Sequence, residues 1–265
     1  MKVYRPKKKH PSKKHSSSLF ESKIFRLFFL GMFLCFSLFI FLFYFPFFRI
    51  TSFDVQGMIK TPECLQGVNS ILSSMIGERF FLLKFKQAEK RILFSCPAAR
   101  KARIKRRGIQ KLTLFLKPRL AAAVLCFKKK GECFFADNLG IIFQETNEAS
   151  SSVANIPLIF IDNDPPSKGK EGCPAEIIRK TAAIAKALKR AGEGVKFFSF
   201  SGRKRIDANT EGGWKIYFSS EGEINEALFK LAFILNKFIP PGKRAFLDYI
   251  DLRFSKAYYK WRSKN

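Results

Sequence analysis

The pattern of hydrophobic and polar positions divides the chain into three parts. Residues 1–26 lack apolar periodicity and are rich in Lys, Pro and Ser, so we predict a basic, disordered tail. Residues 27–48 contain no charged side chain over 22 positions. At about 1.5 Å per residue a helix of this length spans roughly 33 Å, enough for a hydrocarbon core of about 30 Å. We therefore predict a transmembrane helix over 27–48 and a folded part over 50–265.

A cleaved signal peptide is the competing interpretation of this apolar segment. Signal peptides have a shorter apolar core and end in small residues, whereas this segment ends in aromatic residues and Arg49. The tail before it carries nine Lys or Arg and one acidic residue, Glu21. The positive-inside rule then predicts a cytoplasmic tail and an outward-facing folded part, although residues 50–265 themselves carry a net charge of +19.

The first half of the folded part is predicted to have the order β-α-α-β-β. Residues at spacings of three and four predict the helices, and alternation predicts the strands. The predicted elements are a strand over Ile50–Met58, helices over Pro62–Ile76 and Phe85–Phe94, and strands over Ala99–Arg107 and Lys111–Phe127. Together they predict a domain over 50–127.

The second half, residues 128–265, is predicted to be rich in strands. A turn at Asp137–Gly140 lies inside an apolar hairpin over Glu132–Glu145, and helices are expected over Cys173–Ala191 and Glu223–Phe238. Further strands are expected over Ile156–Ile161, Val195–Phe200, Arg203–Asp207, Trp214–Phe218, Phe246–Phe254 and Ala257–Trp261. The fold class is therefore α+β, with two domains in series.

The inventory of reactive side chains argues against an enzyme. Both histidines, His10 and His15, lie in the tail, so no His base, Ser–His pair or HExxH zinc site can form in the folded part. CxxC, Walker A and G-x-S-x-G motifs are also absent from the sequence. We expect no catalytic, cofactor-binding or metal-binding residues, and no small-molecule substrate.

Short motifs in a fixed order resemble the FtsQ/DivIB family of bacterial cell division proteins. They are Val55-Gln56-Gly57; Pro97 with Ala102, Ile104 and Arg106; Ala136–Phe143 with a D-x-x-G-x-x-F pattern; Ile156-Pro157-Leu158; Gly213-Trp214-Lys215-Ile216; and Ile250-Asp251-Leu252-Arg253-Phe254. After the strand beginning at Lys111, the family's Glu-Arg-x-Pro-x-Ala is replaced by Pro118-Arg119-Leu120-Ala121-Ala122-Ala123. This departure puts in doubt any partner contact that depends on the Glu.

The resemblance implies a non-enzymatic role in septation. It implies a bitopic protein of the bacterial inner membrane, located at the division septum, with a POTRA-like domain (50–127) and a larger mixed β-sheet domain with two helices (128–265). The implied partners are FtsB-like and FtsL-like divisome proteins, and the septal peptidoglycan synthase is a further candidate. The implied contact is β-augmentation, in which a partner strand is added to a sheet edge in the C-terminal part.

The last predicted strand supplies the candidate partner-binding residues. They are Ala257, Tyr258, Tyr259, Lys260 and Trp261. A terminal strand offers unpaired backbone groups, and aromatic residues dominate binding hot spots. The other interpretation is that alternate residues face the core and the strand only closes the sheet. Asp251 and Arg253 are expected on one strand face, where an ion pair with a neighbour is the simpler role.

Basic residues crowd the strand pair that follows the two helices. They are Arg100, Lys101, Arg103, Lys105, Arg106, Arg107 and Lys111. They can serve solubility alone, or they can attract anionic lipid or wall polymer, which makes a membrane-tethered polymer or lipid binder the alternative function. Nucleic-acid binding is disfavoured by the expected location. Lysines in the tail, Lys7, Lys8, Lys9, Lys13 and Lys14, are expected to determine topology and attract lipid.

Five cysteines lie after the apolar segment. Cys126 and Cys133 would face each other across a four-residue hairpin loop and could form a disulfide. Reduced, semi-buried thiols are favoured at least as much, because the spacing of Cys64, Cys96, Cys126, Cys133 and Cys173 shows no disulfide framework.

Overall fold

A computed structural model describes residues 18–44, 48–57, 61–108, 110–147, 156–201 and 204–263. The tail lysines and Pro46 lie outside this range. Helix α1 (Ser18–Tyr44) begins nine residues before the predicted transmembrane helix, so the predicted disorder of 18–26 is wrong. The absence of charge marks the part apolar enough to span a membrane, whereas helical structure continues through good helix formers such as Glu21 and Lys23. Lys23–Phe41 is long and apolar enough to cross a membrane.

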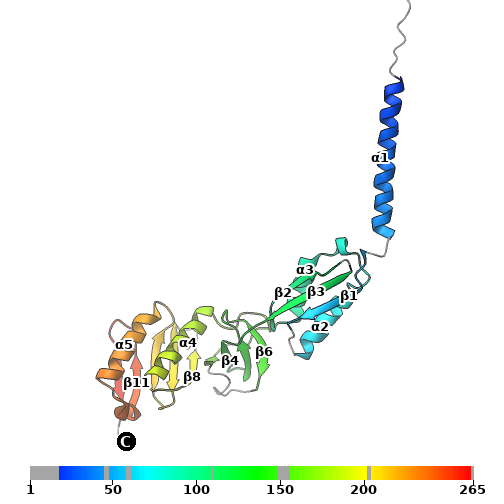
Figure 1. Ribbon diagram of the computed structural model, residues 1–265. Coiled ribbons are helices and arrows are strands. Elements are labelled where there is room, and N and C mark those ends of the chain that lie inside the picture. The colour runs from blue at the N-terminus through cyan, green and yellow to red at the C-terminus, as the bar shows by residue number, and fades with distance from the viewer. Residues whose placement is uncertain are drawn as a thin grey trace, which may run out of the picture.

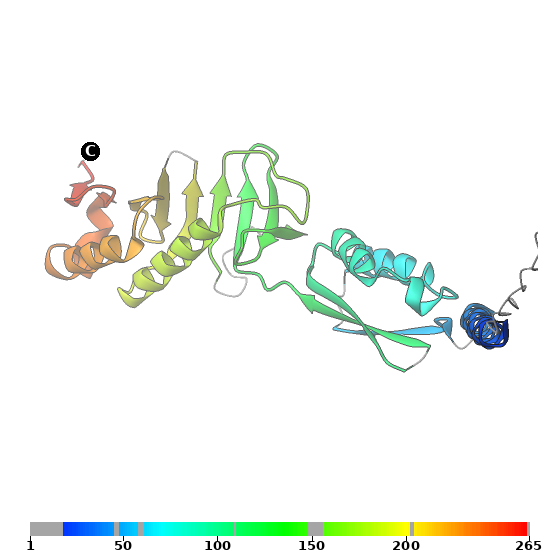
Figure 2. The ribbon, with the colours of Figure 1, turned by 90° about the horizontal axis from the view of Figure 1, so that it is seen from above.

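The first folded unit has the predicted β-α-α-β-β order. Its elements are β1 (Ser52–Gln56), α2 (Pro62–Ser73), the 3₁₀ turn η2 (Phe80–Leu82), α3 (Phe85–Ser95), β2 (Ala99–Arg106) and β3 (Lys111–Pro118). The sheet order is β1-β3-β2, with β1 parallel and β2 antiparallel to β3. Both helices cover one face of this sheet, and the other face is open (Figure 2). Helix α2 ends three residues earlier than predicted.

The first unit has a buried core between its helices and its sheet, and Gly57 allows β1 to end close to β3. Val68, Ile92 and Leu114 are buried between the helices and the sheet. Gly57 has a φ of +87°, and a Cβ there would lie 1.9 Å from the carbonyl oxygen of Leu116. Only glycine allows this backbone conformation and this close approach.

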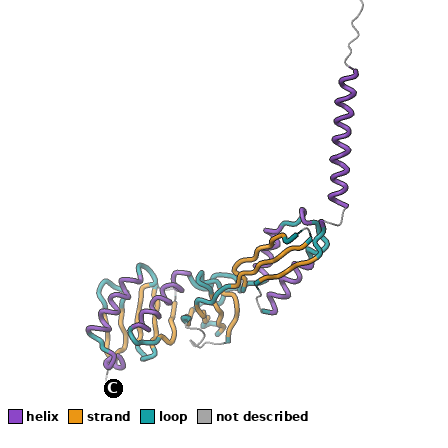
Figure 3. Tube along the Cα trace, in the orientation of Figure 1, coloured by secondary structure: helices purple, strands orange, loops and turns teal. Residues whose placement is uncertain are grey.

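The second folded unit is a nine-stranded mixed sheet. Its strands are β4 (Ala123–Phe127), β5 (Glu132–Ala136), β6 (Ile142–Thr146), β7 (Leu158–Ile161), β8 (Val195–Phe200), β9 (Arg205–Thr210), β10 (Lys215–Ser219), β11 (Leu247–Asp251) and β12 (Tyr258–Trp261). The order across the sheet is β12-β11-β10-β9-β8-β7-β4-β5-β6. The two units follow one another along an elongated molecule (Figures 1 and 3), and the class is α+β as predicted.

Helices α4 (Ala175–Arg190) and α5 (Ile224–Lys237) cover one face of the second sheet and bury Trp214, Phe198 and Phe218. Both helices lie within one to two residues of their predicted bounds. The strand predicted over Phe246–Phe254 is wrong at both ends. The 3₁₀ helix η3 (Pro241–Phe246) precedes β11, and the chain leaves the sheet at Asp251.

One predicted strand, Lys111–Phe127, is two strands in different sheets. β3 ends at Pro118, which has no N–H to continue a ladder, and β4 pairs with β5 and β7 of the second sheet. The expected division after Phe127 therefore assigns β4 to the wrong sheet. The chain crosses between the sheets at residues 119–122.

Arg119 joins the two units at this crossing. Its Nε donates to the carbonyl of Pro97 in the first unit at 2.9 Å, and its guanidinium is paired with Asp137 in the second. Asp137 is 1% exposed, and its other oxygen accepts the backbone N–H groups of Leu139 and Ile141. Phe143, on β6, is buried in the core of the first unit. The D-x-x-G-x-x-F hairpin is therefore part of the joint between the sheets.

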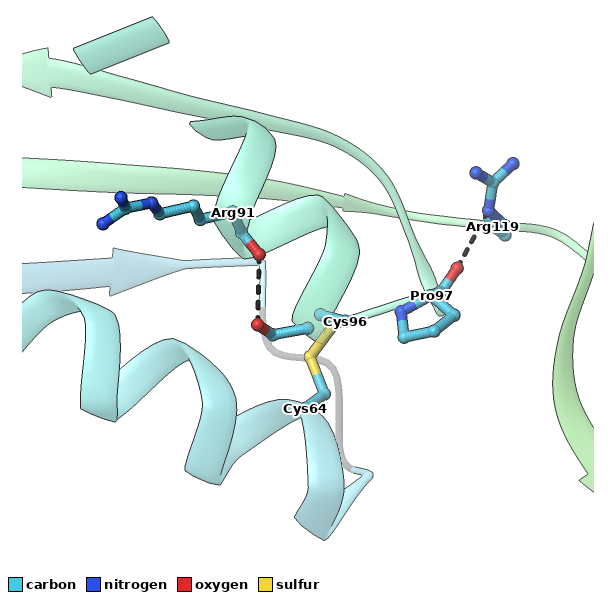
Figure 4. The surroundings of a disulfide bond; sticks show 6 residues. Cys64, Arg91, Cys96, Pro97 and Arg119 are labelled. Atoms are coloured by element: carbon cyan, nitrogen blue, oxygen red, sulfur yellow. Dashed lines mark hydrogen bonds between the residues drawn. A yellow bond between two sulfur atoms is a disulfide. The ribbon is translucent and has the colours of Figure 1, made fainter. Parts of the chain in front are cut away.

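Two disulfides lie in the folded units. Cys126 and Cys133 are directly opposite in β4 and β5, which is the pairing that the hairpin allowed, and they are bonded. Cys64 and Cys96 also form a disulfide, which the sequence analysis missed. It ties the start of α2 to the segment after α3, directly before Pro97 and the Arg119 hydrogen bond (Figure 4). Cys35 and Cys173 are free.

Replacing Cys64 and Cys96 together by Ala should lower the free energy of unfolding by about 3–4 kcal/mol, because the bond closes a loop of 32 residues in the unfolded chain. Chemical denaturation of both proteins measures the change. As a control, alkylation of the unreduced, denatured wild-type chain should label two of the six cysteines, Cys35 and Cys173. Four or more labelled thiols would contradict the two disulfides.

Candidate partner-binding site

Strand β12 is the last strand of the second sheet. It pairs with β11 on one side only, so its other edge has no neighbouring strand among the described residues. All four of its residues are exposed. The five predicted partner-binding residues therefore lie together at a sheet edge, although Ala257 precedes the strand and is half-buried. An edge of this kind can accept an additional strand from a partner.

The register of β12 places its aromatic side chains on both faces of the sheet. Tyr259 is opposite Ile250, and Trp261 is opposite Leu247. Ile250 and Leu247 are buried under the helices, so Tyr259 and Trp261 lie on the helix side. The rings of Tyr259 and Trp261 are 5.7 Å apart, centroid to centroid. Tyr258 is on the face without helices. The sequence left two interpretations, a partner-binding edge and a strand whose alternate residues face the core. Tyr259 and Trp261 do face the helix side, as the second expects, but both stay exposed, as the first expects.

A groove lies between β12 and α5. Its volume is about 410 Å³, and its lining comprises Lys230, Phe233, Ile234, Phe238, Ser255, Ala257 and Tyr259. Phe233 and Phe238 are 49% and 47% exposed, a large fraction for aromatic side chains. The sequence analysis missed both residues. For Phe233 a signal was present in the helix pattern, because Phe229 and Phe233 lie one turn apart on α5, away from the buried Leu231 and Ile234.

Beside this edge, two ion pairs flank Tyr217 on the face of the sheet opposite to α4 and α5. Arg253 pairs with Asp251 at 2.6 Å, and the guanidinium carbon of Arg205, which pairs with Asp207, lies 4.8 Å from the centre of the Tyr217 ring. Arg253 follows the end of β11, so Asp251 and Arg253 do not share a strand face as predicted. They pair with each other, which agrees with the simpler role.

The ionisation of Asp251 follows from this pairing. Burial alone would raise the pKa of Asp251, but hydrogen bonds from the side chain and backbone of Arg253, together with its charge, lower the pKa below its usual value. The same contact raises the pKa of Arg253. Burial raises the pKa of Tyr217, and the neighbouring Asp207 adds to this effect. Asp251 and Arg253 are thus both ionised at neutral pH, and their ion pair stabilises the chain where it leaves β11.

The open face of the first sheet brings together most of the predicted basic residues. The register places Lys101, Arg103, Lys105, Arg107, Lys111 and also Lys117, which the sequence analysis missed, on this face. Arg106 points to the helix side, where its guanidinium carbon lies 4.4 Å from the centre of the Phe80 ring. Arg100 is exposed at a bulge in β2. Asp54 offsets part of the charge through an ion pair with Arg107.

Reactive groups are sparse in the described part of the chain. No cluster of three or more His, Cys, Asp or Glu side chains suited to a metal ion occurs there. Burial, with the nearby Glu171 charge, raises the pKa of the free thiol of Cys173 to about 12, so it is not a nucleophile at neutral pH.

No protein-family model matches this chain, and no curated protein matches it.

Replacing Asp251 by Asn should lower the free energy of unfolding at pH 7, and the difference from the wild type should shrink as the pH falls below about 4. The pKa of Asp251 is depressed in the folded protein, so its contribution is complete above its usual pKa of 3.8 and is lost as the pH falls through the lower folded value. Urea denaturation at several pH values measures this.

The matched control is Asp164→Asn, which removes a carboxylate from an exposed ion pair with Lys129. Exposed pairs contribute little, so this variant should stay within about 0.5 kcal/mol of the wild type. Parallel stability curves for Asp251→Asn and the wild type would contradict the role of the carboxylate.

Proposed function

We propose that this chain is a membrane-anchored, non-enzymatic scaffold of the bacterial division machinery, similar to FtsQ/DivIB. The single observation that carries the proposal is the free edge of β12, because it is bordered on both faces by exposed aromatic residues. Such an edge accepts a partner strand through backbone hydrogen bonds, and the aromatic side chains and the α5 groove would select its sequence. FtsB-like and FtsL-like proteins are the proposed partners.

Further features support the same proposal. An apolar helix precedes a β-α-α-β-β unit, as in the expected order of anchor and POTRA-like domain. Two of the motifs behind the family resemblance have structural roles. Gly57 allows a close backbone contact, and the D-x-x-G-x-x-F hairpin holds the two units together. Two disulfides agree with an oxidising, extracytoplasmic location for residues 50–265.

Tyr259→Glu combined with Trp261→Glu should weaken co-purification of the full chain with its FtsB-like and FtsL-like partners by at least about a hundredfold in affinity, because both rings lie at the proposed contact. Quantitative pull-down and binding assays with the partners of the same organism measure the effect. The matched control is Phe94→Glu, a residue that is 87% exposed but lies on α3 of the first unit.

Septal localisation gives an independent readout. A fluorescent fusion of the full chain should gather at midcell, and truncation after Asp251, which removes β12, should reduce that signal. Unchanged partner binding by a folded Tyr259→Glu, Trp261→Glu protein would exclude β12 as the site. A wild-type fusion spread evenly around the cell would exclude the septal role.

A second candidate function follows from the open basic face of the first sheet. Six cations on one uncovered surface favour a membrane-tethered binder of anionic wall polymer or lipid. In this case the first unit would act independently of β12.

Under this second function, Arg103→Gln combined with Lys105→Gln should lower affinity for a soluble poly(glycerol phosphate) roughly tenfold at about 0.05 M salt. The loss should disappear at about 0.5 M salt, because screening removes the electrostatic contribution. Titration calorimetry at both salt concentrations measures it. Equal affinity of the variant and the wild type at low salt would contradict this function.

A further inference from the structure

The loop between α2 and α3 lies against residues 48–50, on the C-terminal side of helix α1. The backbone N–H of Ile50 donates to the carbonyl of Glu78, and Arg49 and Arg79 form an isolated β-bridge. The Phe48 and Phe81 rings pack edge to face with centroids 6.3 Å apart. Only three residues lie between Tyr44, the end of α1, and Phe48, so the two cannot be more than about 14 Å apart along the chain.

This end of the first unit exposes apolar side chains. Leu82 is 54% exposed and Ile76 is 52% exposed, and Phe81 between them is 44% exposed. All three belong to the short segment from the end of α2 to η2, which continues directly into the Phe48 contact. The opposite end of the unit packs on the second sheet, so these side chains are at the end nearest the membrane helix.

Basic residues neighbour the apolar side chains: Lys84 is two positions after Leu82, and Arg49 forms a β-bridge with Arg79. Arg49, Lys84 and Arg106 are all exposed, and the Arg106 guanidinium lies over the ring of Phe80, which directly precedes Phe81. Glu78 is the one carboxylate in the sequence between Ile76 and Lys84. Exposed apolar groups beside basic residues suit the boundary between headgroups and acyl chains in an anionic membrane.

We propose that this aromatic–basic tip, formed by Ile76, Phe81, Leu82, Arg49, Lys84 and Arg106, docks on the anionic phospholipid surface next to α1. The apolar side chains insert at the headgroup boundary, and the cations contact lipid phosphates. Docking at a second point beside the helix fixes the tilt of the first unit on the membrane. The inference depends on the membrane anchorage proposed above, but it does not depend on the partner of β12.

The test uses the full chain reconstituted into vesicles of phosphatidylcholine with about 30% phosphatidylglycerol. Leu82→Trp places a fluorophore at the tip, and Phe94→Trp is the matched control in the same unit, at an exposed position on the last turn of α3. The native Trp214 and Trp261 lie in the second unit and give a common background. Lipids brominated near the carbonyl group act as quenchers of shallow depth.

We expect at least about fivefold stronger quenching of Leu82→Trp than of Phe94→Trp, with the excess lost in vesicles of phosphatidylcholine alone. Adding Arg49→Gln and Lys84→Gln to Leu82→Trp should remove most of this excess while the covalent tether is unchanged. The last comparison separates docking from mere proximity to the membrane.

Equal quenching at the two positions, or strong quenching that ignores both lipid charge and the Gln substitutions, would overturn the proposal. Emission of Leu82→Trp that responds to soluble poly(glycerol phosphate) but not to brominated lipid would assign the tip to a wall polymer and overturn it as well. Extraction of the chain from vesicles by alkaline carbonate would instead refute the anchorage, so the two failures are distinguishable.

Discussion

The buried pairing of Arg119 with Asp137 is the contact on which the arrangement of the molecule depends. Arg119 is in the crossing segment, and its side chain reaches the Pro97 carbonyl of one unit and Asp137 of the other. A buried carboxylate without its cation would be costly, so neither residue can be removed alone without strain on the joint. Because Asp137 also organises the β5–β6 turn, the same carboxylate sets the local hairpin and the position of β6, whose Phe143 enters the core of the first unit.

Given this joint, the two proposed contact surfaces lie at opposite ends of the molecule. The aromatic–basic tip is at the end of the first unit next to α1, and β12 is at the far end of the second sheet (Figure 1). Between them the cores are separate: Leu112 and Leu114 pack under α2 and α3, whereas Trp214 and Phe218 pack under α4 and α5. A partner bound at β12 would therefore be held at a distance from the membrane that depends on the Arg119 joint.

Local periodicity predicted most elements because each has one buried face; α3, α4 and β8 are within two residues of their predicted bounds. The failures have non-local causes. The segment Lys111–Phe127 has apolar stretches on both sides of Pro118, and the alternation of apolar residues does not show that the chain changes sheets there. The Cys64–Cys96 bond joins residues brought together only by the packing of α2 on α3. At the site, the sequence predicted the β12 edge, and the α5 pattern carried a signal for Phe233. Phe238 lies after the end of α5, so no helix pattern predicted its exposure.

The parallel pairing of β1 with β3 has a mechanical consequence. The chain enters the first unit at the start of β1 and leaves it at the end of β3, and the two strands pair in register from Ser52↔Lys111 to Gln56↔Phe115. A pulling force between α1 and the second sheet therefore acts in opposite directions along two adjacent parallel strands. Such a force loads the ladder in shear, so its hydrogen bonds resist together instead of opening one at a time. The parallel pairing of β1 with β3 thereby lets the first unit resist tension applied between α1 and the second sheet.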